Sequence, residues 1–341
     1  MTQAPSFSVI SGEQVVDTLR GREKQVTAMV ERAYRLHGEG LTVNPDSYFL
    51  RFPERPSSRI IALPASVGGE VDVHGIKWIS SFPENVATGI PRASAVVILN
   101  DTATGYPLAC LESSVISASR TAASAALAAV TIADRRGVTP RRVGFIGVGL
   151  IARYLHTYLV ANGLAFDEVG VFDLAREHAE GFEEYLTRSE AGAVTIHDSA
   201  ESLIAASDLI VLATVAGEPH LLDPALFAHN PLVLHVSLRD LSPEVVLASY
   251  NLVDDIDHCL KANTSPHLAE QRTGNRDFVA GTLYDLLEGR TTPPADRPVV
   301  FSPFGLGVLD LAVAKYVYDE VNAAGTLLTV PGFFHEMRRY G

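Results

Sequence analysis

The fold is decided by residues 142–152, which read Arg-Val-Gly-Phe-Ile-Gly-Val-Gly-Leu-Ile-Ala. This apolar run ends in Gly-x-Gly-x-x-Ala, a helix-like segment follows, and a second apolar run at 169–172 ends in Asp173. Gly147 permits the tight turn from strand to helix, and Gly149 lets the backbone approach a pyrophosphate. The N-terminus of the helix offers free N–H groups to that anion. This order of elements predicts a dinucleotide site.

Asp173 indicates which dinucleotide binds. It lies 26 residues after Gly147, at the end of the second strand, where a carboxylate can accept hydrogen bonds from both ribose hydroxyls. An acid repels a 2′-phosphate, so the predicted cofactor is NAD rather than NADP. For the glycine motif alone, a tight turn without any ligand remains the alternative.

Bulk properties narrow the class of protein. At 341 residues the chain is long for one hydrophobic core, so we expect two domains. The formal net charge of −13 argues against nucleic acid or an anionic membrane as partner, because both attract basic surfaces. Cys110 and Cys259 are far apart in the sequence, which suits a reducing cytoplasm. The N-terminus does not read as a signal peptide, and no apolar run reaches about 20 residues. A cytoplasmic location is expected.

Strand and helix patterns alternate from residue 142 onward. Five or six parallel strands with intervening helices make a Rossmann-type doubly wound α/β sheet. The expected strands are 143–146, 169–172, 194–197, 209–213, 232–236 and 252–253. Residues 278–287 read as helix packing without a chemical signal of their own.

The rest of the sequence predicts a smaller, sheet-containing α+β domain. Its expected helices are 11–19 (with a capping box formed by Ser11 and Gln14), 22–37 and 117–134, and its expected strands are 47–51, 59–65, 73–79, 93–100 and 107–111. An apolar run at 298–301 precedes a loop and a helix from 308 to about 321, which we expect to return to this domain. The predicted domains are therefore 1–120 with 308–341 for substrate binding and dimerisation, and 121–307 for NAD.

Several polar residues stand where the sequence otherwise reads as apolar strand or helix. Lys77 is flanked by apolar residues, and composition alone favours a lysine at a sheet edge whose amine reaches solvent. Arg120 lies near the start of the Ala-rich helix, where a cation opposes the helix dipole. Arg51 ends one strand and Arg92 opens another; taken singly, each is more readily a surface residue. Asp240 follows a strand of the nucleotide fold at the edge where ligands bind, and a turn or N-cap acid is its alternative.

Metal and covalent chemistry find no support in the sequence. The histidines are scattered without HxH or HExxH spacing, so we interpret them as caps, core or loop residues and predict no metal. They include His197, His220, His229, His235, His258 and His267. Neither a Gly-x-Ser-x-Gly elbow nor a Cys/His pair is found.

Taken together, these features resemble the ornithine cyclodeaminase/mu-crystallin family over nearly the whole chain. The most specific block reads Gly-Tyr-Pro-Leu-Ala-Cys-Leu-Glu at 105–112 and Ser-Ala-Ser-Arg-Thr-Ala-Ala-Ser-Ala at 117–125. It keeps the family's Arg-Thr-Ala-Ala motif. The resemblance implies a dimer that pairs through the non-nucleotide domain.

Roles for individual residues follow from the resemblance. Lys77 matches the family's active-site lysine, Arg51 its substrate-carboxylate arginine and Arg120 its helix arginine, which substrate and cofactor share. Asp240 matches the catalytic aspartate. The cofactor contacts we expect are Arg120, Gly147, Val148, Gly149, Leu150, Ile151, Asp173, Thr214, Ser237 and Ser302.

Departures from ornithine cyclodeaminase point to a narrower branch. Residues 241–244 read Leu-Ser-Pro-Glu and lack the expected lysine-containing loop, while 78–85, 89–95 and 301–307 resemble dehydrogenases of 2,3-diaminopropionate biosynthesis. That branch serves siderophore (staphyloferrin B type) and peptide-antibiotic pathways. Its members oxidise N-(2-amino-2-carboxyethyl)-L-glutamate with NAD and hydrolyse the product to L-2,3-diaminopropionate and 2-oxoglutarate.

The branch's substrate carries three carboxylates, which suits several arginines. The resemblance implies that Arg51 and Arg120 clamp the glutamyl α-carboxylate. Arg92 is added for a distal carboxylate, Lys77 assists proton transfer, and Asp240 activates the hydrolytic water. Ornithine cyclisation, reduction of a cyclic imine and non-catalytic binding of NAD or another ligand remain alternatives.

Overall fold

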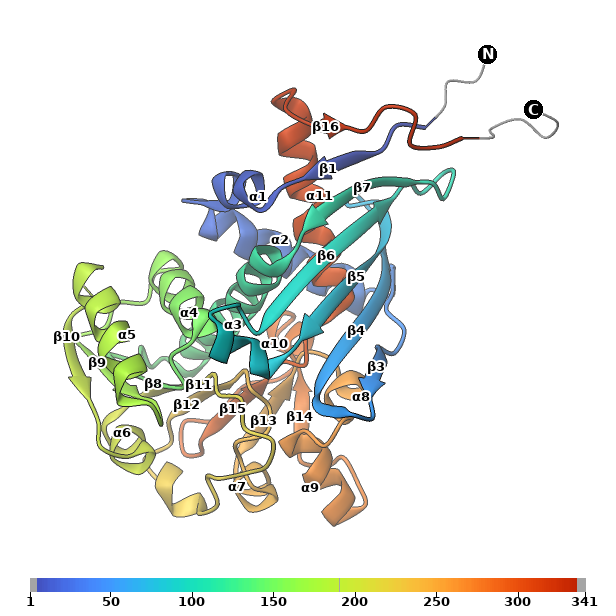
Figure 1. The fold of residues 1–341 in the computed structure, drawn as a ribbon. Coiled ribbons are helices and arrows are strands. Elements are labelled where there is room, and N and C mark those ends of the chain that lie inside the picture. Colours follow the sequence, from blue (N-terminus) through green and yellow to red (C-terminus); the bar gives the residue numbers. More distant parts are fainter. Residues whose placement is uncertain (1–4, 190, 336–341) are drawn as a thin grey trace. The chain divides into compact units, whose positions relative to one another are not determined.

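The chain folds into two compact units, which Figure 1 shows in a computed structural model. The structure describes residues 5–189 and 191–335. The first unit comprises Met1–Arg120 and Leu306–Gly341, and the second comprises Thr121–Gly305. The sequence placed the return to the first unit at residue 308, and the structure places it at Leu306.

The second unit is built on a sheet of eight parallel strands. They are β8 (Arg142–Ile146), β9 (Glu168–Phe172), β10 (Ala193–Ile196), β11 (Leu209–Leu212), β12 (Leu232–His235), β13 (Tyr250–Val253), β14 (Val279–Thr282) and β15 (Val299–Ser302). Their order in the sheet is β10-β9-β8-β11-β12-β15-β13-β14. The chain passes from β8 outward to β10 and then returns to β11 on the other side of β8. This reversal is the switch point of a doubly wound sheet, so the predicted Rossmann-type fold is confirmed.

Helices connect these strands and shield them from water. They are α4 (Leu150–Ala161), α5 (Arg176–Arg188), α6 (Ala200–Ala206), η2 (Pro224–Phe227), α7 (Pro243–Ala248), α8 (Ile256–Cys259), α9 (Ser265–Thr273) and α10 (Leu283–Leu287). All four residues of β11 and all four of β12 are buried, as expected of parallel strands covered on both faces. Ile210 and Val233 share a core cluster with Leu203 of α6 and Val245 of α7.

The interpretation of residues 278–287 as helix packing was wrong for its first half. Val279–Thr282 form β14, and the helix begins only at Leu283. Thr282 caps this helix in a capping box with Asp285, and this cap separates the strand from the helix. Together with β15, which was expected only as an apolar run at 298–301, β14 brings the sheet to eight strands instead of the expected five or six.

The first unit contains a second, mixed sheet. Its strands are β1 (Ser8–Ile10), β2 (Thr42–Val43), β3 (Tyr48–Phe52), β4 (Arg55–Val67), β5 (Val73–Ser81), β6 (Ala93–Asn100), β7 (Pro107–Glu112) and β16 (Leu328–Thr329). Its helices are α1 (Gly12–Leu19), α2 (Glu23–Gly38), η1 (Pro83–Thr88) and α11 (Gly307–Ala323), and α3 (Ser114–Arg136) leads into the second unit. The sheet order is β16-β1-β7-β6-β5-β4-β2, with β3 paired to β4. The predicted capping box of Ser11 and Gln14 is present.

One face of this sheet is covered by α11, the last helix of the chain, as Figure 1 shows. A Cβ added to Gly75 would lie 3.0 Å from the side chain of Leu311, so β5 and α11 pack closely. Along β5, Lys77 and Ser81 point to this covered side, whereas Trp78 is exposed on the other. We call the α11 side the inner face and the Trp78 side the outer face.

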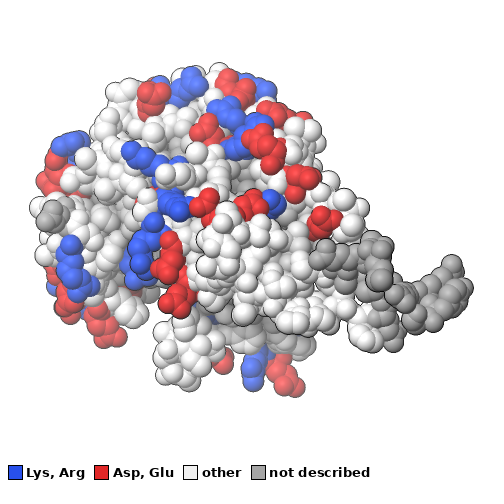
Figure 2. Space-filling view, turned by 90° about the horizontal axis from the view of Figure 1, so that it is seen from above, with Lys and Arg blue, Asp and Glu red and all other residues white. Residues whose placement is uncertain are grey.

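Charged side chains of both signs lie at the surface, whereas the longest helix, α3, is mostly buried. Figure 2 shows acidic and basic side chains intermingled over one side of the molecule, and many of them pair, as Arg141 does with Asp167. Such exposed pairs contribute about 0–1 kcal/mol each. By length and composition α3 could cross a membrane, but 72% of its most apolar window is buried, which is typical of a core helix.

Candidate functional site

The glycine turn at the end of β8 has the geometry of a dinucleotide loop. Gly147 has a φ of +81°, and a Cβ there would lie 2.7 Å from the carbonyl oxygen of Ala213. Only glycine fits this position without strain. Gly149 is the N-cap of α4, and a Cβ there would meet no atom within 4 Å. The first N–H groups of α4 therefore face open space that an anion can enter.

Asp173 lies against the same turn. Its Oδ2 accepts a hydrogen bond of 3.1 Å from the backbone N–H of Val148, and its Oδ1 accepts one of 3.0 Å from Ala175. Leu150 and Ile151 form the first turn of α4 beside it. The structure thus brings together six of the predicted cofactor residues: Gly147, Val148, Gly149, Leu150, Ile151 and Asp173.

This geometry predicts that Gly149→Ala weakens NAD binding at least tenfold, about 1.4 kcal/mol, without lowering the melting temperature. The added methyl group occupies space needed by the pyrophosphate but touches no protein atom. Calorimetric titration with NAD and a thermal scan measure the two effects. As a control, Gly181→Ala in α5 also adds a methyl group to open space and should leave NAD binding unchanged. Wild-type affinity in Gly149→Ala would contradict the assignment.

Asp240 forms the centre of a second cluster in the same unit. It is fully buried, and hydroxyl groups of Thr214 and Ser237 donate to its two oxygens. Nε2 of His220 lies 3.1 Å from Oδ1, and Nε2 of His235 lies 3.2 Å from Oδ2. Burial raises the pKa of the Asp240 carboxyl, but bonds to His220, His235 and Ser237 outweigh it and hold the pKa far below its usual range. Asp240 is therefore an anion at all ordinary pH values.

His235 extends this cluster into the core. Its side chain is fully buried, and its Nδ1 lies 3.2 Å from the hydroxyl of Ser302. Three residues expected to contact the cofactor thus belong to this cluster. Thr214 and Ser237 bond to Asp240 directly, and Ser302 contacts His235, which lies beside Asp240. The prediction that His220 and His235 are ordinary cap, core or loop residues missed their contact with Asp240.

In the first unit, Lys77 and Arg120 share one buried carboxylate. Nζ of Lys77 lies 2.6 Å from Oδ2 of Asp310, and Nε of Arg120 donates to Oδ1 at 3.1 Å. The side chains of Lys77 and Asp310 are 2% and 0% exposed. Lys77 is therefore not the solvent-reaching edge residue that composition alone favours, and Arg120 is not a surface arginine.

The environment of Lys77 tunes its proton affinity. Burial lowers the pKa of Lys77 and has the largest influence on it. The negative charge of Asp310 raises this pKa, and the positive charge of Arg120 lowers it; the resulting pKa is about 8. A lysine with this pKa exists in both protonation states near neutral pH and can give or take a proton.

Further cations continue along the inner face beyond Lys77. Arg51 of β3 lies opposite Arg59 of β4, and Arg59 lies opposite Ser81 of β5. The guanidinium of Arg92 donates to the Ser81 hydroxyl at 2.8 Å, and burial lowers the pKa of Arg92. Arg51 stacks over the ring of Phe49. Within the described residues, no carboxylate pairs with Arg51 or Arg92.

Two charged residues of the first unit, Asp310 and Arg59, were not predicted from the sequence. Asp310 stands in an apolar stretch, Val-Leu-Asp-Leu, and this is the same signal that singled out Lys77. Arg59 could have been found only from its strand partner Arg51, because register is not visible in the sequence. Among residues 5–189 and 191–335, no group of three or more His, Cys, Asp or Glu side chains could hold a metal ion.

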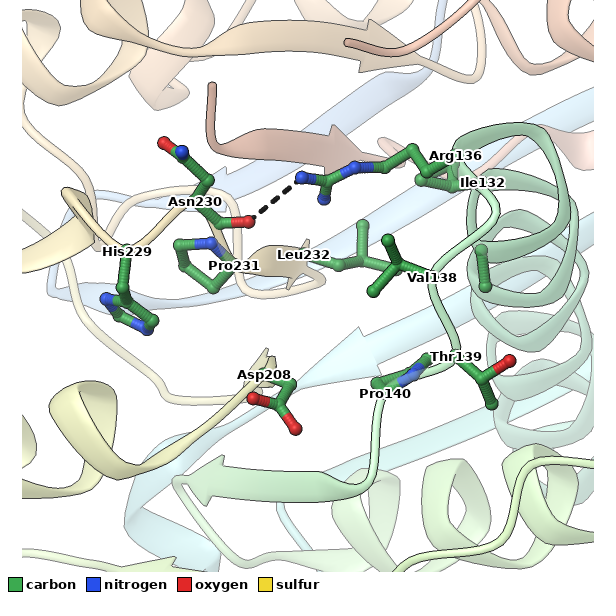
Figure 3. Close-up of a pocket in the computed structure, with 11 residues that line it drawn as sticks. Ile132, Arg136, Val138, Thr139, Pro140, Asp208, His229, Asn230, Pro231 and Leu232 are labelled. Atoms are coloured by element: carbon green, nitrogen blue, oxygen red, sulfur yellow. Dashed lines mark hydrogen bonds between the residues drawn. The ribbon is translucent and has the colours of Figure 1, made fainter. Parts of the chain in front are cut away.

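A pocket lies at the edge of the second unit's sheet that is formed by the amino ends of the strands. Figure 3 shows this cavity of about 220 Å³, lined in part by Pro140, Asp208 and Leu232. These residues stand at the amino ends of β8, β11 and β12, whereas Gly147 and Asp240 follow carboxyl ends. In the figure, Arg136 reaches the carbonyl oxygen of Asn230, a bond of 3.1 Å. This pocket is separate from Gly147 and Asp240.

Comparisons with known proteins agree on one family. The sequence matches the ornithine cyclodeaminase/mu-crystallin family over residues 9–325. It is 28% identical to N-((2S)-2-amino-2-carboxyethyl)-L-glutamate dehydrogenase of Staphylococcus aureus, covering 86% of this chain and 89% of that protein. The crystal structure of CmnK superposes with a TM-score of 0.87 at 29% identity, covering 97% and 100% of the two chains. Thermococcus litoralis Δ1-pyrroline-2-carboxylate reductase, solved with NADH and L-proline, gives 0.87 at 23% identity, covering 95% and 100%.

Proposed function

Because this chain belongs to the ornithine cyclodeaminase/mu-crystallin family, we propose that it is an NAD-dependent oxidoreductase acting on the CH–NH bond of an amino acid. The glycine turn at Gly147 and the adjacent Asp173 support NAD as the cofactor. Lys77, Arg120 and Asp240 match the family's functional residues and support catalysis over simple ligand binding. A cytoplasmic location fits a pyridine-nucleotide enzyme with two free cysteines.

The substrate that we propose is N-(2-amino-2-carboxyethyl)-L-glutamate. The observation that carries this proposal is the row of cations along the inner face, from Lys77 and Arg120 to Arg51 and Arg92. Four residues of strand separate Lys77 from Ser81, the partner of Arg92, which corresponds to about 13 Å. A substrate with several carboxylates can neutralise cations spread over this length. Ornithine, with one carboxylate, would leave Arg92 unmatched.

Each cation has a proposed part in binding. Arg51 and Arg120 hold the glutamyl α-carboxylate, because a guanidinium binds a carboxylate through two parallel hydrogen bonds. Arg92, fixed by Ser81, holds a distal carboxylate. Lys77 in its neutral form takes the proton of the substrate's secondary ammonium, which frees the nitrogen lone pair. NAD supplies the acceptor for the hydride of the glutamyl Cα, and water then hydrolyses the resulting imine.

The products distinguish this activity from others in the family. Purified protein with NAD and the conjugate should release free 2-oxoglutarate and L-2,3-diaminopropionate and accumulate NADH, which absorbance follows. Ornithine cyclodeamination recycles its cofactor and leaves no net NADH. Turnover of ornithine or reduction of a cyclic imine, with none of the conjugate, would support those alternatives instead. Tight NAD binding without any turnover would indicate a non-catalytic protein.

Arg92 should control recognition of the distal carboxylate. We expect Arg92→Met to raise KM for the conjugate about tenfold or more while kcat changes little, since the carboxylate is bound equally in ground and transition states. Steady-state kinetics measure both parameters. Arg32→Met removes an exposed arginine paired with Glu70 and should change neither. An unchanged KM in Arg92→Met would remove Arg92 from the site.

The product suggests a place in metabolism. L-2,3-diaminopropionate is a building block for siderophores and peptide antibiotics in the branch that the sequence resembles. We propose that this enzyme supplies such a natural-product pathway.

We also propose a homodimer formed through the outer face of the first unit's sheet. Trp78 lies opposite Val96, and Ile76 lies opposite Ile98, so that apolar side chains continue across two strands. Trp78 is 41% exposed and is the chain's single tryptophan. Trp78→Glu should convert the dimer to a monomer in light scattering. Val160→Glu, on the exposed side of α4, should leave the mass unchanged. Monomeric wild-type protein would contradict the proposal.

A further inference from the structure

Asp240 is buried and enclosed by the side chains that bond to it. An ionised carboxylate accepts about four hydrogen bonds. Oδ1 faces Thr214 and His220, and Oδ2 accepts a hydrogen bond from Ser237. Nε2 of His235 lies 3.2 Å from Oδ2 and accepts the backbone N–H of Asp240. The side chain is fully buried. Because the bonds to its neighbours also hold its pKa far below the usual range, Asp240 is a weak base that solvent does not reach.

His220 occupies the exposed side of the same cluster. It lies in the loop that follows β11, and its side chain is 41% exposed. Its backbone N–H and that of Leu221 both donate to the carbonyl oxygen of Asp240, at 3.0 and 2.9 Å. Nε2 of His220 faces Oδ1 of Asp240, and Nδ1 has no hydrogen-bond partner among the described residues. The imidazole is thus fixed at one nitrogen and accessible at the other.

The location of this pair agrees with a catalytic role. β8, β11 and β12 are neighbours in the sheet, and Gly147, His220 and Asp240 all follow their carboxyl ends. Ligands of doubly wound sheets bind at this edge. His235, the other imidazole beside Asp240, cannot replace His220, because both of its ring nitrogens already have partners. Nδ1 faces the Ser302 hydroxyl, and Nε2 accepts the backbone N–H of Asp240.

We propose that His220 is the general base that activates the hydrolytic water, and that Asp240 is its positioning residue. The arrangement is that of a His–carboxylate pair, in which the buried acid fixes the orientation of the imidazole. This inference rests on the proposed function, since it assigns a residue to the hydrolysis of the imine.

The step balances in protons and electrons. Loss of hydride from the glutamyl Cα leaves a protonated imine. Water attacks the imine carbon, the C=N π electrons move to nitrogen, and Nδ1 of His220 takes one water proton. The C–N bond then breaks with its electron pair going to nitrogen, which takes the proton back from His220. The hydroxyl proton leaves to solvent as the carbonyl of 2-oxoglutarate closes.

Separating the two half-reactions tests the proposal. In His220→Gln the amide can still donate to Asp240 but cannot accept a proton from water. Rapid mixing should show first-turnover NADH formation within about twofold of wild type, while steady-state release of 2-oxoglutarate falls about 10²–10⁴-fold. In His220→Ala, added imidazole should restore part of the release rate. Retained NAD affinity shows that each variant is folded.

Controls separate the failure of this inference from that of the function. His229→Gln changes a histidine bonded to the Ser207 carbonyl at the other edge of the sheet and should behave as wild type. Wild-type release of 2-oxoglutarate by His220→Gln would overturn the role of His220 alone. An equal loss in first-turnover and steady-state rates, without imidazole rescue, would reduce His220 to a structural residue. Absence of NADH with wild-type protein would overturn the proposed function itself.

Discussion

Replacing Asp310 by alanine should lower the free energy of unfolding of the first unit by about 3–5 kcal/mol. Asp310 is the carboxylate shared by Lys77 and Arg120, and its side chain is fully buried. Without it, two cations remain in a dry environment with no anion. Breaking a buried ion pair from one side is expensive for this reason, even where the intact pair contributes little. Urea denaturation followed by circular dichroism measures the loss.

Two further variants make the expectation specific. Asp319→Ala removes an acid from the same helix, but one that pairs with Lys315 at the surface, and should cost at most about 0.5 kcal/mol. The double variant Lys77→Met/Asp310→Leu should recover at least half of the loss, because apolar side chains replace the buried pair. A loss below about 1 kcal/mol in Asp310→Ala would show that the buried cluster is not held by Asp310.

Replacing Lys77 by arginine should slow NADH formation about 10²–10⁴-fold. The guanidinium keeps the positive charge beside Asp310 but does not deprotonate in proteins, so it cannot take the substrate's proton. In the wild type, the pKa of about 8 means that the neutral amine becomes the major form of Lys77 as the pH rises through 8. The rate of NADH formation should therefore increase with pH up to about 8 and then level off.

Stopped-flow absorbance with saturating NAD and substrate measures this pH dependence. Lys315→Arg, a surface exchange on α11, should keep the wild-type profile. If Lys77→Arg reacts as fast as wild type, Lys77 serves only as a charge, and proton transfer belongs to another group.

The extent to which the sequence predicts this fold differs from one strand to another. In the nucleotide unit, Gly147 must be glycine because of the adjacent Ala213 carbonyl, and β11 is apolar because both sheet faces are covered. These local causes can be seen in the sequence. The strand Val279–Thr282 cannot be recognised in the same way, because four residues that lead directly into a helix look like the start of that helix. Only the Thr282 and Asp285 pair marked the boundary.

Site residues could be predicted where a charged residue stands beside an apolar run. Lys77 and Asp240 stood out as charges beside apolar runs. Asp310 had the same signal but was not singled out within the helix expected from 308 to about 321. The contact between His220 and Asp240 joins two loops 20 residues apart, and the row from Arg51 to Arg59 depends on strand register. Such pairings are set by the tertiary fold, so a single sequence does not reveal them.

We propose that one enzyme removes hydride from the glutamyl Cα and then adds water to the same carbon. The most direct measurement uses the conjugate deuterated at that Cα, incubated with wild-type protein and NAD in ¹⁸O-water, with analysis by mass spectrometry. We expect one deuterium in NADH for each 2-oxoglutarate formed, and ¹⁸O in its keto group. Deuterium retained in the amino-acid product, or 2-oxoglutarate formed without labelled NADH, would contradict it.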